Sequence, residues 1–253
     1  MEDINIKQIK VSQLIDKLSS RFELPFELVA QAKKMYANDQ RPYLEIETEI
    51  IDFSKKVELM EQIINKPIDQ NILDNSILII GPMGVGKSTI SNELSKTIGL
   101  KRLSLDSREQ LSSLYQQQPK FNIFKEFEFY LTASVLTGIN EPMIIDFGAG
   151  HSIYENPIMF YEMKKLVTKF KNIELILPSK DLNESLQIIN NRISTRNGNN
   201  LDQRILDNKH FIESPCNYEL STDIIYTNNR TLEEITGAIL HSIEERKTET
   251  KKH

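Results

Sequence analysis

The chain has few of the residues and segments that mark several classes of protein. It contains one cysteine, Cys216, among 253 residues, which excludes an internal disulfide framework and favours a reducing compartment. No apolar run approaches the ~20 residues that a membrane-spanning helix needs. The opening segment MEDINIKQIK lacks the apolar stretch of a secretory signal peptide. We therefore expect a cytoplasmic protein with no membrane partner.

The chain also has no excess of basic residues. The 31 Lys and Arg residues are outnumbered by 36 Asp and Glu residues, and the net charge is -5. Such a chain has no global electrostatic attraction for nucleic acid, so a nucleic-acid partner is disfavoured.

Glycine is absent from the first part of the chain, and this divides the sequence. All 9 glycines lie between Gly81 and Gly237. A chain of 253 residues has room for one full domain and an appendage. We predict a mainly helical N-terminal appendage over residues 1–75, an α/β domain over 76–246 and a charged tail over 247–253.

Apolar residues of the appendage recur at helical spacing. One helix is predicted through Val11 and Leu18, and a second begins at Phe26 after Pro25. The segment YLEIETEII (43–51) alternates like a strand but runs into a helical pattern, so its type is open. A DNA-binding helix-turn-helix is disfavoured, because residues 1–75 carry 10 basic and 14 acidic side chains. We expect a helical arm packed on the main domain, and a candidate surface for a protein partner or self-association.

Five apolar segments after residue 75 alternate with stretches of helical character. The apolar segments are SILII (76–80), RLSL (102–105), PMIID (142–146), IELILP (173–178) and DIIYT (223–227). The helical stretches are predicted to begin at Lys87, Asp106, Phe121, Pro157, Asp181 and Thr231. Strands that alternate with helices imply a parallel sheet covered on both faces. The predicted fold class is therefore α/β, with a five-stranded parallel sheet sandwiched by helices.

The first apolar segment leads into GPMGVGKST (81–89), which matches the phosphate-binding pattern G-x-x-x-x-G-K-[ST] in full. Its glycines allow several backbone N–H groups to turn toward phosphate oxygens, and the next helix points its positive end at the same place. Lys87 is predicted to reach the β- and γ-phosphates, and the Ser88 hydroxyl to ligate Mg²⁺. The predicted nucleotide-binding residues of this loop are Gly81, Met83, Gly84, Val85, Gly86, Lys87, Ser88 and Thr89.

A second signal follows the third apolar segment. Asp146 ends that segment, at the edge of an α/β sheet where ligands bind. It is a candidate Mg²⁺ ligand or a candidate base for a substrate hydroxyl. Gly148 and Gly150 remove side chains where an acceptor would approach. His151 is a possible substrate contact, but an exposed loop histidine is the favoured interpretation.

Arginines form a third signal. Arg192 and Arg196 lie four apart on one helical face ahead of the polar segment NGNN. Arginines in such a position are typical of a phosphoryl-transfer lid, where they neutralise charge on the transferring group. Arg192 is a candidate catalytic residue and Arg196 a candidate substrate contact. Arg230, after the last strand, is a candidate for stacking on the adenine.

In this order, these segments resemble the shikimate kinase-like P-loop small-molecule kinases over roughly residues 76–245. RLSLD resembles the family's second strand, whose final acidic residue, here Asp106, binds substrate or metal. FKEFE (124–128) resembles the family's F-R-x-x-E, and FGAG (147–150) replaces its three consecutive glycines. The resemblance implies ATP and Mg²⁺ as cofactors and a small-molecule acceptor.

Departures from the family pattern fall on the acceptor side. Lys125 replaces an arginine that grips a carboxylate, and Ser214-Pro215-Cys216 replaces a second arginine. One carboxylate of the family's D-x-D is Ser104 here. We expect a Mg-ATP-dependent phosphotransferase with a divergent acceptor, in which Lys125 binds an anionic group. The identity of the base, Asp106 or Asp146, is open, as is ATP against GTP. The alternatives are a regulatory ATPase switch with a partner-binding arm, and a toxin-type kinase of a nucleotide sugar.

Overall fold

The computed structural model describes residues 4–22, 26–37, 41–117, 124–195 and 201–250. It divides into two compact units. One unit comprises Met1–Lys66 with Glu155–Met163, and the other comprises Pro67–Tyr154 with Lys164–His253. None of the described helices is both long and apolar enough to cross a bilayer.

The N-terminal segment of the first unit is helical. Its helices are α1 (Ile4–Phe22), α2 (Phe26–Ala37) and α3 (Tyr43–Ile64), and α1 packs against both of the others. The segment 43–51, whose type the sequence left open, is part of α3. Ile46 and Ile50 are spaced four apart and are both buried, so helical spacing prevails over the local alternation.

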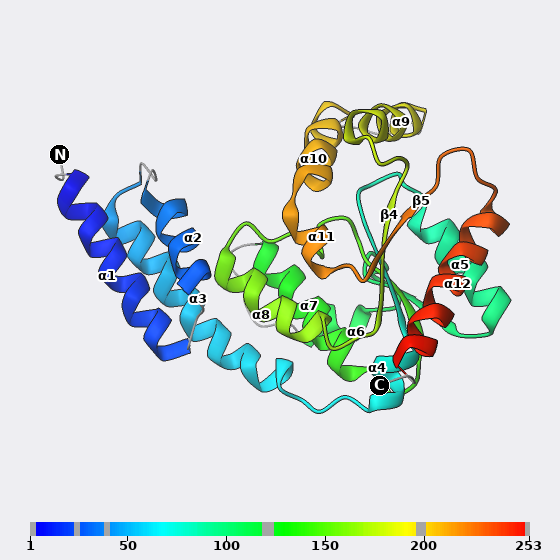
Figure 1. Cartoon of the computed structure of the whole chain (residues 1–253). Coiled ribbons are helices and arrows are strands. Elements are labelled where there is room, and N and C mark those ends of the chain that lie inside the picture. The colour runs from blue at the N-terminus through cyan, green and yellow to red at the C-terminus, as the bar shows by residue number, and fades with distance from the viewer. Residues whose placement is uncertain (1–3, 23–25, 38–40, 118–123, 196–200, 251–253) are drawn as a thin grey trace. The chain divides into compact units, whose positions relative to one another are not determined.

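The second unit is built on a parallel sheet, as predicted (Figure 1). Its strands run in the order β2-β3-β1-β4-β5, and every neighbouring pair is parallel. The strands are β1 (Ile77–Ile80), β2 (Lys101–Ser104), β3 (Met143–Asp146), β4 (Asn172–Leu177) and β5 (Asp223–Tyr226). Strands β1 and β4 are buried along their whole length. Strand β1 is accordingly a continuous apolar segment, whereas β4 also buries Asn172 and Glu174.

Helices cover both faces of this sheet. Helices α5 and α12 lie on one face, and α7 and α11 on the other (Figure 1). The helices of the second unit, with α8 shared between the units, are α4 (Gln70–Asn75), α5 (Lys87–Ile98), α6 (Ser112–Gln117), α7 (Phe124–Gly138), α8 (Pro157–Val167), α9 (Leu182–Ser194), α10 (Leu201–Glu213), α11 (Pro215–Leu220) and α12 (Leu232–Thr250). The last helix begins with a capping box, because Thr231 and Glu234 exchange hydrogen bonds of 2.7 and 3.2 Å.

Three helical predictions need correction. The helix expected from Asp106 begins only at Ser112, and Asp106 lies in a turn. Helices α10 and α11 were not predicted, because the polar segment NGNN was interpreted as the start of a loop. Helix α12 extends to Thr250, past residue 246, where the α/β domain was predicted to end.

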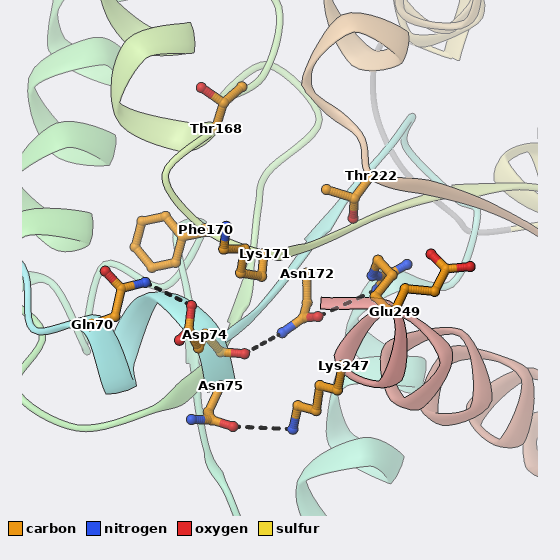
Figure 2. Close-up of a pocket in the computed structure, with 11 residues that line it drawn as sticks. Gln70, Asp74, Asn75, Thr168, Phe170, Lys171, Asn172, Thr222, Lys247 and Glu249 are labelled. Atoms are coloured by element: carbon orange, nitrogen blue, oxygen red, sulfur yellow. Dashed lines mark hydrogen bonds between the residues drawn. The ribbon is translucent and has the colours of Figure 1, made fainter. Parts of the chain in front are cut away.

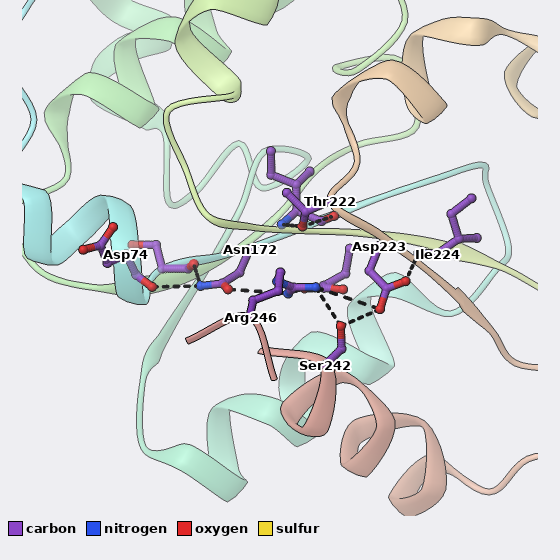
Figure 3. Close-up of polar contacts among 10 residues, drawn as sticks. Asp74, Asn172, Thr222, Asp223, Ile224, Ser242 and Arg246 are labelled. Carbon is purple, nitrogen blue, oxygen red and sulfur yellow. Dashed lines mark hydrogen bonds and ion pairs between the residues drawn. The ribbon is translucent and has the colours of Figure 1, made fainter. Parts of the chain in front are cut away.

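The amino ends of the strands form a polar edge, opposite the phosphate-binding loop. A pocket of about 760 Å³ lies there, between α4, the start of β4 and the end of α12 (Figure 2). Asn172 donates hydrogen bonds to the carbonyl oxygens of Asp74 and Ser76 at 3.0 and 3.1 Å. The guanidinium of Arg246 pairs with buried Glu174 and donates to Ser242 at 2.7 Å (Figure 3). These contacts hold α12 and α4 against the sheet. Burial raises the pKa of Glu174 to about 7, although the charge of Arg246 lowers it.

Candidate active site

The predicted phosphate-binding loop connects the carboxyl end of β1 to the first turn of α5. Gly81, Gly84 and Gly86 all have positive φ, a conformation that favours glycine. A Cβ atom at Gly81 would lie 2.6 Å from the carbonyl oxygen of Ile176, so β4 leaves no space for a side chain there. Val85 is buried and anchors the loop in the core. The loop geometry thus follows from backbone freedom at the glycines and from close packing on β4.

Lys87, the first residue of α5, is buried beneath this loop. Its ammonium donates hydrogen bonds to the carbonyl oxygens of Gly81 and Pro82, at 2.8 and 2.9 Å. Burial lowers the pKa of Lys87 to about 8, although Asp146 and Asp106 raise it. The loop therefore holds a cation at its centre, which suits an anionic ligand such as a phosphate group.

Ser88 lies beside the carboxylate that ends β3. The Ser88 hydroxyl donates to Asp146 Oδ2 at 2.8 Å, and Arg102 of β2 pairs with the same oxygen. Ser104, where the family pattern has a carboxylate, pairs in register with Asp146. The side chain of Asp146 is 3% exposed, so its charge depends on these two partners.

The pair Ser88 and Asp146 fits a magnesium ion. A hydroxyl and a carboxylate are hard oxygen donors, and Mg²⁺ takes few protein ligands because it keeps several waters and binds substrate phosphates. Among the described residues there is no group of three or more His, Cys, Asp or Glu side chains that could hold a metal alone. The residues present therefore suit a metal that arrives with phosphate, and not a closed structural site.

Asp106 follows β2 and lies against the glycine segment after β3. A Cβ atom at Gly148 would be 2.1 Å from Asp106 Oδ1 and 2.5 Å from His151 Nδ1. The distance between Asp106 Oδ1 and His151 Nδ1 is 4.0 Å. Glycine at position 148 is thus what allows the carboxylate and the imidazole to approach each other.

His151 is buried, which contradicts its interpretation as an exposed loop residue. Within the described part of the chain, neither ring nitrogen makes a hydrogen bond of good geometry. Burial lowers the pKa of His151, while Glu128 and then Asp106 raise it and Lys125 lowers it. The imidazole is therefore a buried polar group whose two nitrogens lack a hydrogen-bond partner of good geometry in the part of the chain that the structure describes.

Lys125 and Glu128 lie one turn apart on α7 and face the second glycine. Lys125 Nζ is 2.5 Å from Glu128 Oε2 and donates to the carbonyl oxygen of Gly150 at 2.9 Å. It also lies over the ring of Tyr154, 5.5 Å from its centroid. A Cβ atom at Gly150 would come within 2.8 Å of Glu128 Oε1. The cation that was predicted to bind an anionic acceptor group already has a carboxylate partner.

Most of the predicted loop residues line one pocket of about 240 Å³. Its lining residues are Met83, Gly84, Gly86, Lys87, Ser88, Thr89, Asp106, Ala149 and Ile193. The phosphate-binding loop and Asp106 thus share a cavity, and Ala149 places the glycine segment beside it.

Helices α9 and α10 flank the loop. Ile193 and Ile189 of α9 face Gly84, where a Cβ atom would lie 3.1 Å from Ile193 Cγ1. Arg192 is half-buried on the same helix and is not among the residues that line the pocket. Arg196 lies outside the described residues.

The α10 residue Asn208 accepts a hydrogen bond from the backbone N–H of Met83 at 3.0 Å. Arg230, predicted to meet the adenine, is exposed in the turn after β5.

Three contributors were not predicted from the sequence. Arg102 and Asn208 act through partners that are distant in sequence, and Glu128 pairs with Lys125 one helical turn away. Glu128 alone left a signal, since it is the final residue of FKEFE. His151 was considered, but its burial depends on packing that no local pattern reports.

No protein-family model matches the chain, and a search of curated proteins finds no match. Solved structures do match. The shikimate kinase of Acinetobacter baumannii, solved with shikimate, is 18% identical with a TM-score of 0.49, covering 68% of this chain and 94% of that chain. The shikimate kinase of Bacteroides thetaiotaomicron is 17% identical with a TM-score of 0.47, covering 67% of this chain and 98% of that chain. A gluconokinase of Sinorhizobium meliloti is 14% identical with a TM-score of 0.48, covering 72% of this chain and 99% of that chain.

Proposed function

We propose that the chain is a Mg-ATP-dependent phosphotransferase that transfers the γ-phosphoryl group to a hydroxyl of a small molecule. It resembles shikimate kinases in sequence motifs but differs from them in its acceptor. The observation that carries the proposal is that Asp106 lines the same pocket as Lys87 and Ser88. A nucleotide switch requires the phosphate-binding residues alone, whereas a kinase also requires a group that accepts a hydroxyl proton beside them.

The two aspartates are assigned different roles because their surroundings differ. Asp146 is buried and bound to Ser88 and Arg102, so it suits a fixed position beside the metal. The side chain of Asp106 is 70% exposed and lines the pocket together with Lys87. Asp106 is therefore the group that orients the acceptor hydroxyl and takes its proton.

In this reaction the acceptor oxygen forms a bond to the γ-phosphorus. The bond from that phosphorus to the oxygen shared with the β-phosphate breaks, the hydroxyl proton passes to Asp106, and ADP leaves. Lys87 and the loop amides hold the β- and γ-phosphate oxygens, and Arg192 stabilises the transferring group from α9. When bound, Mg²⁺ neutralises charge on the phosphates.

The test is a screen of small metabolites with Mg-ATP that detects ADP and a product heavier by one phosphoryl group. The matched control is Lys87→Ala, which we expect to abolish transfer. Turnover that persists in this variant would contradict the role of Lys87. ATP turnover that appears only with an added protein partner, and yields no phosphorylated small molecule, would indicate the switch instead.

A further inference from the structure

The side chains around the glycine segment define the chemistry of an acceptor subsite. This inference rests on the proposed function, because it concerns the molecule that receives the phosphoryl group. The segment Gly148–Ala149–Gly150 adjoins the nucleotide pocket through Ala149. Asp106 and His151 lie against its first glycine, and Glu128 and Lys125 against its last. These four side chains therefore form one continuous polar cluster beside the phosphate-binding loop.

The positive charge of this cluster is already neutralised. Lys125 forms an ion pair with Glu128 at 2.5 Å, donates to the carbonyl oxygen of Gly150 at 2.9 Å and lies over the ring of Tyr154. The Lys125 side chain is 23% exposed and that of Glu128 is 10% exposed, so the pair is only weakly screened by water. A carboxylate on the acceptor would have to compete with Glu128 for this cation.

The net charge of the four side chains is negative, since Lys125 contributes one positive charge and Glu128 and Asp106 contribute one negative charge each. Lys87, which lines the nucleotide pocket with Asp106, is assigned to the phosphates of ATP in the proposed function. An anionic acceptor would therefore meet a net repulsion from this cluster, in addition to the charge of the γ-phosphate. Lys125, which stands where the family has an arginine, also disfavours an anionic acceptor, because an ammonium lacks the planar pair of donors that binds a carboxylate.

The imidazole of His151 is a second feature of the cluster, and it favours a hydroxyl group on the acceptor. It is buried, and neither of its nitrogens has a hydrogen-bond partner of good geometry among the described residues. A neutral imidazole has one donor and one acceptor, and so does a hydroxyl group. A buried polar group without a partner is costly, so the site gains free energy from a ligand hydroxyl beside His151.

We propose that the acceptor is an uncharged polyhydroxylated small molecule. One of its hydroxyls is bound by Asp106 and His151, and another donates to Glu128. The hydroxyl at Asp106 is the one phosphorylated, and its proton passes to that carboxylate as ADP leaves. Glu128 therefore sets specificity in two ways: it accepts from the neutral acceptor, and it neutralises the cation that an acidic acceptor would need.

The first experiment separates a cell extract of small metabolites by charge. An anion exchanger gives a neutral flow-through and an anionic eluate, and each is incubated with the protein and Mg-ATP. We expect a product heavier by one phosphoryl group from the flow-through, absent with Lys87→Ala. Product from the eluate alone overturns this inference and leaves the proposed function intact. Product from neither fraction overturns the proposed function, and this inference with it.

The second experiment compares matched acceptors that differ only in charge. Shikimate and its methyl ester carry the same hydroxyls, and glucitol differs from gluconate by a hydroxymethyl group in place of the carboxylate. We expect kcat/KM to be at least about tenfold higher for the uncharged member of a pair. Equal values, or a preference for the carboxylate, contradict the proposal.

Glu128→Gln tests the specificity role directly. It keeps the shape of the side chain but leaves Lys125 without its carboxylate, so the preference for the uncharged member should fall or reverse. The matched control is Glu141→Gln, which breaks the exposed Lys101–Glu141 pair at the other edge of the sheet. A purely structural effect of Glu128→Gln would lower kcat/KM equally for the charged and the uncharged acceptor. An unchanged ratio of these two values would therefore contradict the specificity role of Glu128.

Discussion

The hydroxyl of Ser88 and the carboxylate of Asp146 are hydrogen-bonded at 2.8 Å, although they lie 58 residues apart. The contact joins the first turn of α5 to the end of β3, and it holds two oxygen donors beside the buried ammonium of Lys87. Arg102 pairs with the same carboxylate from β2. Three neighbouring strands thus converge on the place where phosphate and metal are proposed to bind.

This arrangement predicts that Asp146→Asn raises the Mg²⁺ concentration needed for half-maximal turnover. The amide keeps the size of the side chain but is a weaker ligand, so we expect the rate at fixed Mg²⁺ to fall by about 10²-fold. The measurement is phosphoryl transfer against Mg²⁺ at constant ATP. Asp106→Asn is the matched comparison. It should lower the maximal rate of transfer by about 10²-fold or more without changing the Mg²⁺ requirement, and a shift of that requirement in both variants would contradict the division of roles.

Gly148→Ala is predicted to impair catalysis. The added Cβ atom would lie 2.1 Å from Asp106 Oδ1, so the exposed carboxylate must move away from the pocket. We expect kcat to fall by about 10²-fold, since a small displacement of a catalytic group is costly. The added Cβ atom would also lie 2.5 Å from Nδ1 of buried His151, so the unfolding temperature should fall as well. Gly237→Ala is the control, because a Cβ atom there meets open space within α12, and it should stabilise the fold by about 0.5–1 kcal/mol.

The sheet could be predicted from the sequence because each strand is a short apolar segment followed by a helical pattern. Buried parallel strands such as β1 are apolar on both faces, and this composition leaves a clear signal. The loop before Lys87 was predictable for a similar reason, since its glycines meet local backbone requirements.

The partners of the site could not be predicted in the same way. The Arg102–Asp146 pair depends on β2 lying next to β3, and the sequence does not give the strand order. The burial of His151 depends on packing that no local pattern reports. Lys125 and Glu128 lie three residues apart on α7, a spacing that the sequence shows, but the sequence does not show that the pair faces Gly150. Each of these contacts changes the charge available to a ligand, so the charge of the acceptor could not be predicted from the sequence.

Lys87→Met is predicted to abolish nucleotide binding while the fold remains. Methionine fills most of the lysine volume, but it removes the only cation held by the carbonyl oxygens of Gly81 and Pro82 in the described loop. We expect the affinity for ATP to fall by at least about 10²-fold, as measured by calorimetry. Lys96→Met, on the exposed face of the same helix, should bind ATP like the parent protein. Loss of binding in both variants would indicate general damage to α5.

The stability of the second unit is predicted to decrease as pH rises, because of Glu174. Burial raises the pKa of this carboxyl from its usual 4.5 to about 7. The folded state therefore holds a proton that the unfolded state releases. The resulting stabilisation is complete below pH about 4.5 and is lost as pH rises through about 7, with a total on the order of 3 kcal/mol.

Glu174→Gln removes this titration and keeps an oxygen for Arg246. The unfolding temperature of the parent protein, measured relative to Glu174→Gln, should therefore fall by several degrees between pH 5 and pH 8.5. Glu219→Gln is the control, since it makes the same change in an exposed carboxylate paired with Lys164. A pH dependence that is the same in the parent and in Glu174→Gln would show that Glu174 stays ionised in its pair with Arg246. The guanidinium would then outweigh the cost of burying the charge.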